Sequence, residues 1–222
     1  MFFFSFLTDA PFGNKEVFFS LENYQAIWDK TFYQLLLFKS FRLGLEVTVL
    51  CFLIGFPCAL ILAKHVKGYW REAIFVLIIL PFWSNALVRI FSWTMVLRGN
   101  GVIEMTLNWI SPGFGDFSLM FTYQAILIGL VHSYLPYMIL TCYVSIQSID
   151  DSIIEAARVL GASRIMILMR LIIPLSLPGI AAGSVLIFIP VVGSFMEPRI
   201  LGGREGTFIG TCLLYTSDAA DE

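Results

Sequence analysis

The sequence predicts an all-α, polytopic membrane protein, and three observations support this fold class. Hydrophobic residues make up 58% of the chain, charged residues only 14%, and the mean hydropathy is +0.83. Water-soluble domains commonly carry about 25% charged residues. Four apolar stretches are each long enough to cross roughly 30 Å of hydrocarbon as a helix. A more polar segment with a helical pattern separates the last two stretches. We therefore expect a bundle of transmembrane helices.

The first 32 residues precede the long apolar stretches. Met1 opens a run of seven mostly apolar residues, MFFFSFL, which is too short to span a bilayer. We expect this run to be the end of a longer helix, so that the chain is truncated there; a short interfacial anchor is the alternative. Residues 8–32 contain turn formers such as Pro11 and Gly13 and predict an extramembrane loop. Ser20 can cap a short interfacial helix at the end of this loop.

The four apolar stretches predict four membrane-spanning helices, at about 43–63, 73–97, 119–146 and 171–195. Several of them carry Pro or Gly, and neighbouring helices can satisfy the backbone groups that such kinks free. Gly179 and Gly183 form a ridge of small residues, which lets two helices approach closely. We therefore expect helix packing at this ridge rather than a contact with substrate.

The polar segment between the last two stretches predicts two short helices joined by a tight turn. Asp150 or Asp151 can cap a first helix that ends at Leu160. Gly161 suits the left-handed conformation that commonly closes a helix. Ser163 can cap a second helix. The first helix has an apolar stripe at helical spacing, formed by Ile153, Ile154, Ala157 and Leu160.

The same segment, 147–178, contains a recognisable motif. Residues 155–174 read EAARVLGASRIMILMRLIIP. The motif consists of Glu-Ala-Ala, a Gly four positions after the second Ala, and a final aliphatic pair before Pro. It resembles the EAA loop of the membrane subunits of ABC importers. That loop usually ends in Ile-x-Leu, so this chain departs only by exchanging aliphatic residues. In that family the first helix couples to the ATPase. The resemblance assigns this coupling role to Glu155, Ala156, Ala157 and Gly161.

The resemblance covers nearly all of residues 1–211 and implies a MetI-like permease domain. It implies three partners: an ATP-binding subunit, a homologous second permease and a periplasmic substrate-binding protein. It also implies that the EAA segment faces the cytoplasm of a bacterium, at the plasma (inner) membrane. The basic residues are divided almost evenly between the two sides, so the positive-inside rule does not decide the orientation. The chain has no GxxxxGK[ST] motif, so we expect no enzyme activity in it and ATP hydrolysis on a separate chain.

A second motif places an arginine inside an apolar stretch. Residues 81–90, PFWSNALVRI, resemble the P-F-W-[ST]-N-x-L-[IV]-R-I run of the spermidine/putrescine permease subfamily. Trp83 offers a π face to a cation, and Asn85 offers a donor and an acceptor, so both are candidates for the substrate pathway. Arg89 would repel a polyamine, and insertion of an arginine costs about 2.5–3.5 kcal/mol. We expect it to be structural, paired with a carboxylate or with backbone carbonyls.

Three more residues invite interpretation. Glu46 can pair with Arg89 as a structural intramembrane charge, or lie near the outer interface beside Arg42; the sequence leaves both open. His132 lies among tyrosines in the third stretch, either in a packed cluster or at a substrate contact. Residues 193–203, GSFMEPRILGG, resemble the G-x-F-x-x-P-x-x-L-G-G end of the fifth helix in polyamine-type permeases. Glu197 in this run is the third candidate for the substrate pathway.

These resemblances predict an importer permease for spermidine or putrescine, with related permeases for ferric iron, thiamine or oxyanions as alternatives. A secondary transporter or a channel fragment is less well supported, since it would need an intramembrane relay and no ATPase-docking loop. The spacing of Cys, His, Asp and Glu predicts no metal site and no cofactor, and the net charge of −2 argues against nucleic-acid binding. Residues 212–222, CLLYTSDAADE, resemble translated sequencing adapter. We expect them to be a non-native tail that stands where a further helix would follow, so that the chain is truncated at this end as well.

Overall fold

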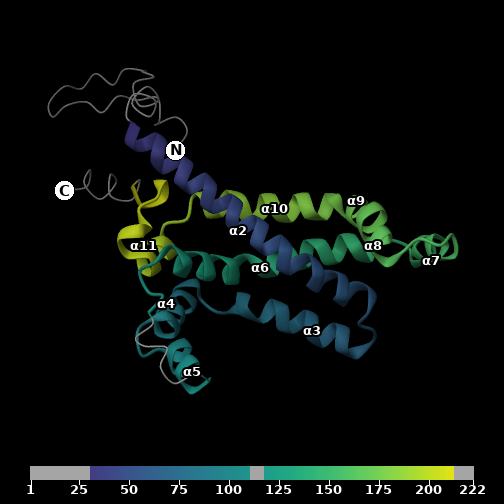
Figure 1. The fold of residues 1–222 in the computed structure, drawn as a ribbon, viewed down its shortest axis with the longest axis horizontal. Helices are drawn as coiled ribbons and strands as arrows, with labels where there is room; N and C mark the ends of the chain where they lie inside the picture. Colours follow the sequence, from purple (N-terminus) through teal and green to yellow (C-terminus); the bar gives the residue numbers. More distant parts are fainter. Residues whose placement is uncertain (1–30, 111–117, 213–222) are drawn as a thin grey trace.

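The computed structural model describes residues 31–110 and 118–212, and within those ranges all regular structure is helical (Figure 1). This confirms the predicted all-α class. The interfacial helix after Ser20 and the tail at 212–222, apart from Cys212, lie outside the described residues. In chain order the helices are α2 (Thr31–Lys64), α3 (Tyr69–Ile79), η2 (Leu80–Trp83), α4 (Ala86–Leu97), α5 (Val102–Ile110), α6 (Tyr123–Gln147), α7 (Asp151–Val159), α8 (Arg164–Ile167), η3 (Leu168–Ile172), α9 (Ile173–Leu175), α10 (Leu177–Val192), α11 (Met196–Gly202) and η4 (Gly203–Gly206).

Three long helices form the core. Helices α6 and α10 run along the long axis, α2 crosses them obliquely, and the three pack against one another (Figure 1). The side chains between them are apolar and fully buried, as burial in a bundle requires: Val47, Cys51, Leu130, Met138 and Ile187. By length and composition, α2 and α6 can each cross a membrane, and the described residues contain up to four spans if each of two bent helix pairs is one span.

The second predicted stretch, 73–97, is not one helix, and that expectation is wrong. The chain bends by 95° between Tyr69–Trp83 and Ala86–Thr106. Pro81 cannot donate a backbone hydrogen bond, and the chain forms a single 3₁₀ turn (η2) around it. Asn85 then starts α4, because its side-chain oxygen accepts a hydrogen bond from the Leu87 N–H at 2.8 Å.

The fourth predicted stretch is also interrupted. The segment Arg164–Leu175 meets Leu177–Val192 at 64°. Ser176 lies at this bend, is fully buried, and donates its hydroxyl to the Ile173 carbonyl at 3.1 Å. Hydropathy alone predicted one continuous span here, because a bend between two apolar helices leaves the apolar run unbroken.

The packing role of the small-residue ridge is confirmed. A Cβ atom added at Gly179 would lie 2.6 Å from the Thr141 carbonyl oxygen of α6, and one added at Gly183 would lie 3.0 Å from Met138 Sδ. Real Cβ atoms essentially never show a contact under 3.0 Å such as the one at Gly179, and an added Cβ at Gly183 would also crowd Thr141 Oγ1. The absence of side chains therefore sets the spacing between α10 and α6.

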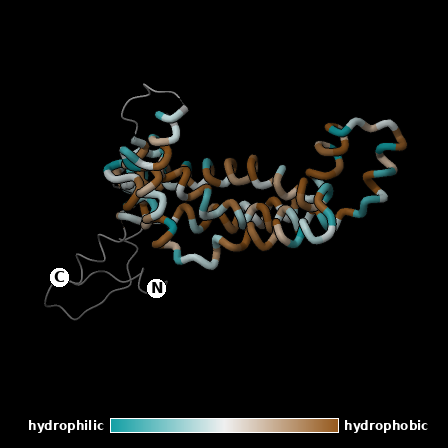
Figure 2. Tube along the Cα trace, turned by 90° about the horizontal axis from the view of Figure 1, so that it is seen from below, coloured by the Kyte–Doolittle hydropathy of each residue, from teal (hydrophilic) through white to brown (hydrophobic). Residues whose placement is uncertain are grey.

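The two ends of the bundle differ in shape. Figure 2 shows a predominantly hydrophobic middle with hydrophilic residues concentrated towards both ends. Helices α4, α5 and α11 gather at one end, while α7 projects beyond the opposite end (Figure 1). The predicted coupling residues lie at the projecting α7 end, and the predicted substrate-pathway residues lie at the other end, on or beside η2, α4 and α11.

Candidate functional site

The EAA segment folds as the predicted helical hairpin. The Asp150 carboxylate caps α7 by accepting a hydrogen bond from the Ser152 N–H at 2.9 Å. Gly161 has a φ of +84°, which is the left-handed conformation that favours glycine. The Ser163 hydroxyl caps α8 by accepting from the Met166 N–H at 3.3 Å. The second helix continues through a π-helical turn, η3, before the bend at Ser176.

The face of α7 that the sequence selected for coupling is open to solvent. Glu155, Ala156 and Gly161 are exposed, and Ala157 is half-buried. Ile154 alone of the predicted stripe is buried, at 6% exposed. Leu160 is 87% exposed and Ile153 46% exposed, so most of the apolar stripe does not face the bundle. Leu160 lies at the tip of the hairpin, beyond the reach of the bundle.

A lysine that the sequence analysis did not single out fastens α7 to the bundle. The Lys64 ammonium, at the end of α2, donates to the Ile149 carbonyl at 2.7 Å and to Asp151 Oδ1 at 2.7 Å. The Lys64 ammonium lowers the pKa of Asp151, chiefly through this hydrogen bond, and the hydrogen bonds with Ser152 lower the pKa of Asp150. Lys64 and Asp151 are 87 residues apart, and a pairing at that separation carries no local sequence signal.

The Lys64–Asp151 pair should make the base of α7 sensitive to acid. A carboxylate whose pKa is lowered by folding stabilises the fold above its ordinary pKa, which is 3.8 for Asp151, and the effect is lost as pH falls through the lowered value. A spin label at position 158 should therefore gain mobility below that pH. Asp151→Asn should show the greater mobility already at neutral pH. Equal mobility in both proteins at neutral pH would contradict this role for the pair.

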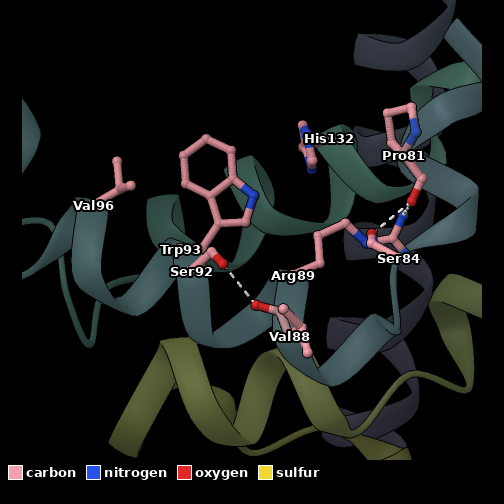
Figure 3. A pocket seen from close by; sticks show the side chains of 8 residues that line it. All are labelled: Pro81, Ser84, Val88, Arg89, Ser92, Trp93, Val96 and His132. Atoms are coloured by element: carbon pink, nitrogen blue, oxygen red, sulfur yellow. Dashed lines mark hydrogen bonds between the residues drawn. The ribbon is translucent and has the colours of Figure 1, made fainter. Parts of the chain in front are cut away.

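At the other functional region, η2 and α4 bring Arg89 to a pocket (Figure 3). One guanidinium NH₂ group, Nη1, donates to the Pro81 carbonyl at 3.4 Å. Of the two partners expected for Arg89, the structure thus shows a backbone carbonyl. The pocket has a volume of about 280 Å³ and is lined by Arg89, Ser84, Ser92, Trp93 and His132, among others.

Trp93 was missed by the sequence analysis, and it lines this pocket where Trp83 does not. Its ring meets His132 edge-on, with 5.3 Å between centroids. The sequence signal that could have identified Trp93 is its position four residues after Arg89, since residues four apart share a helix face. Trp83 is 90% exposed, on the outside of the η2 turn. His132 thus contacts Trp93 of α4 and also lines the pocket, so both interpretations of this residue stay predictions.

The two acidic candidates are each held by hydrogen bonds. Glu46 accepts from Arg42 Nε at 2.7 Å and from the Tyr123 hydroxyl at 2.7 Å. It therefore lies beside Arg42, and the pairing with Arg89 is not formed. Glu197, in the first turn of α11, accepts from the Ser194 hydroxyl at 2.8 Å.

The candidates for the substrate pathway lie on neighbouring elements rather than in one site. Trp83 and Asn85 flank the junction of η2 and α4, and α4 packs against α11, which carries Glu197. The side-chain oxygen of Asn85 is already used in capping α4. At the same end, the Lys39 ammonium on α2 donates to the Glu205 carbonyl at 2.8 Å. Among the described residues no cluster of His, Cys, Asp and Glu can hold a metal ion.

Comparisons with known proteins identify the family and the fold. Residues 55–221 match the family described as "Binding-protein-dependent transport system inner membrane component". The spermidine/putrescine transport system permease protein PotB of Escherichia coli K12 is 36% identical over 94% of this chain and 75% of its own length. A crystal structure of a bacterial ABC transporter that imports alginate has a TM-score of 0.69 at 18% identity, over 94% of this chain and 76% of that one.

A second crystal structure, of a bacterial alginate ABC transporter in complex with its alginate-bound periplasmic protein, has a TM-score of 0.67 at 17% identity, over 91% of this chain and 73% of that one. At such identities the likeness shows a shared fold. The family match covers most of the chain and includes the whole EAA hairpin. The chain belongs to the family of inner membrane components of binding-protein-dependent transport systems, the ABC permeases.

Proposed function

We propose that this chain is the membrane-spanning permease subunit of an ATP-driven importer for spermidine or putrescine. The observation that supports the coupling role is the exposed α7 hairpin, capped at both ends and projecting from the bundle. The substrate assignment rests on the similarity to PotB over nearly the whole chain, together with the PFWSNALVRI and GSFMEPRILGG runs.

In this proposal three other chains complete the transporter. A separate ATP-binding subunit hydrolyses ATP and engages α7 through Glu155, Ala156, Ala157 and Gly161. A homologous second permease forms the other half of the pathway, and a periplasmic binding protein delivers the substrate. Closure of the ATP-binding subunits would displace α7, and Lys64 would pass this movement to α2. The transporter would lie in the inner membrane of a bacterium.

The orientation is testable by cysteine labelling. We expect the connection around Lys67 and the hairpin around Arg158 to face the cytoplasm, since both lie at the α7 end of the bundle. In a background with the native cysteines replaced, an impermeant thiol reagent added to intact cells should not label position 67 or 158. Positions 98 and 204, exposed at the opposite end, should label and serve as controls. Labelling of 67 or 158 from outside would refute this orientation.

The substrate assignment predicts a defect from Trp83→Ala. Polyamine ammonium groups lose water along the pathway, and a desolvated cation–π contact is worth about 2 kcal/mol. Uptake of radiolabelled putrescine should therefore fall severalfold or more. Trp83 is 90% exposed, so its removal leaves the core of this chain intact. Trp109→Ala is the matched control, because Trp109 is 86% exposed on α5, and it should transport normally.

Glu197 and the binding protein supply a second test of the substrate. Glu197→Gln should weaken uptake mainly at low salt, where steering by a charge is least screened. The decisive measurement is stimulation of ATP hydrolysis by loaded binding proteins, using the reconstituted transporter. Stimulation by a polyamine-loaded protein is expected. Stimulation only by an iron-, thiamine- or oxyanion-loaded protein would leave the family assignment in place and end the polyamine assignment.

A further inference from the structure

A second pocket lies at the base of the EAA hairpin, where the ends of α2, α7 and α8 meet. Its volume is about 640 Å³, and it combines basic and aliphatic walls. The basic side chains are Lys64, His65, Arg158 and Arg164. The aliphatic floor includes Ile154 and Ile167, which are 6% and 5% exposed. A pocket of this composition suits a ligand that has both an anionic and an apolar part.

Two of the basic groups are available to a ligand. The Lys64 ammonium already bonds to Asp151 and to the Ile149 carbonyl. Within the part of the chain that the structure describes, Arg158 and Arg164 are exposed and form no salt bridge. The acidic residues of α7, such as Glu155, do not line the pocket. Its rim therefore keeps two uncompensated guanidinium groups.

We propose that this pocket binds the phosphodiester headgroup of an anionic phospholipid, with the first part of an acyl chain against the aliphatic floor. The apolar run of α2 ends at Lys64, so the pocket lies level with the edge of the hydrocarbon, where lipid headgroups are found. Guanidinium groups bind phosphate oxygens in a bidentate manner. A free phosphate would satisfy the arginines but would leave the aliphatic floor uncovered. The proposal requires that the chain is membrane-embedded and does not depend on the identity of the substrate.

The test uses the full chain purified in detergent and native mass spectrometry. Phosphatidylglycerol and phosphatidylcholine are titrated separately, with inorganic phosphate as the third ligand. One phosphatidylglycerol should bind more tightly than phosphatidylcholine. In Arg158→Gln/Arg164→Gln this affinity should fall about twenty-five-fold, because each basic residue near an anionic surface contributes roughly a fivefold gain. Arg158→Lys/Arg164→Lys keeps both charges but cannot form the bidentate contacts, so it should lose less affinity than the glutamine pair.

The matched control is Arg98→Gln/Arg204→Gln, which removes two exposed arginines at the opposite end of the bundle and should leave phosphatidylglycerol binding unchanged. Equal affinity for the two lipids would overturn the proposal, as would an equal loss in the two pairs of variants. Binding of inorganic phosphate as tightly as phosphatidylglycerol would also overturn it and would identify a free-anion site. If the lipids show no preference while the 158/164 pair abolishes association with the ATP-binding subunit, the pocket is a protein-docking site and the lipid assignment is wrong.

Discussion

Gly179→Ala should destabilise the bundle by about 2 kcal/mol. The added Cβ would lie 2.6 Å from the Thr141 carbonyl oxygen, and no change of rotamer moves a backbone atom. Overpacking of this kind commonly costs 1–3 kcal/mol, and a rigid neighbour places it near the upper figure. The better helix propensity of alanine returns only about 1 kcal/mol. Equilibrium unfolding of the full chain in mixed micelles, followed by circular dichroism, measures the difference.

Gly193→Ala is the matched control for this substitution. Gly193 caps the end of α10 with a φ of −87°, and the atom nearest to an added Cβ is the Pro190 carbonyl oxygen at 3.8 Å. The same chemical change should therefore leave stability unchanged or slightly raised. If the two variants unfold alike, the close approach of α10 and α6 does not depend on the missing side chain.

Glu155→Lys should abolish coupled transport while leaving the chain folded in the membrane. Glu155 is exposed on α7, so the reversal changes charge at the proposed ATPase-docking surface and removes no packing. An unfavourable charge contact at an interface costs several kcal/mol, so uptake and copurification of the ATP-binding subunit should both fall by at least about tenfold. Both are measured in cells that express the complete set of subunits.

Glu72→Lys makes the same charge reversal outside the hairpin. Glu72 is exposed in the first turn of α3, at the same end of the bundle as α7 (Figure 1). It should copurify and transport nearly as the unchanged protein does, apart from a small helix-dipole effect. Normal copurification and uptake in Glu155→Lys would remove the coupling role from this face of α7.

Local chemistry explains which features the sequence could predict. Asp150, Gly161 and Ser163 each act on backbone groups within three residues, so the boundaries of the hairpin could be predicted. The burial of the apolar stripe could not be predicted, because Leu160 follows the helical period but extends past the bundle that would bury it. The neighbours of α7 belong to other elements, and their positions are not encoded in its own spacing.

The bends and the long-range pairs could not be predicted from the sequence, for a related reason. Hydropathy is the same whether an apolar run is straight or turned by 95° between Trp83 and Ala86. Glu46 had two plausible cationic partners, and only the fold shows that Arg42 and Tyr123 bind it. Trp83 was chosen for its chemistry, whereas the pocket beside Arg89 is lined by Trp93. In each case residue type was informative, and the missing information was which elements pack together.

Helix α2 is a single helix that is hydrogen-bonded to other elements near both of its ends. Lys39 holds it to Glu205 on one side, and Lys64 holds it to α7 on the other. Lys64 lies 25 positions after Lys39, a rise of about 38 Å at 1.5 Å per residue, and α2 is one unbroken helix through Pro57. A tilt of about 5° about one end would move the other by roughly 3 Å over that length. Displacement at the hairpin can thus reach the opposite face of the membrane by leverage, without a chain of side-chain rearrangements between them.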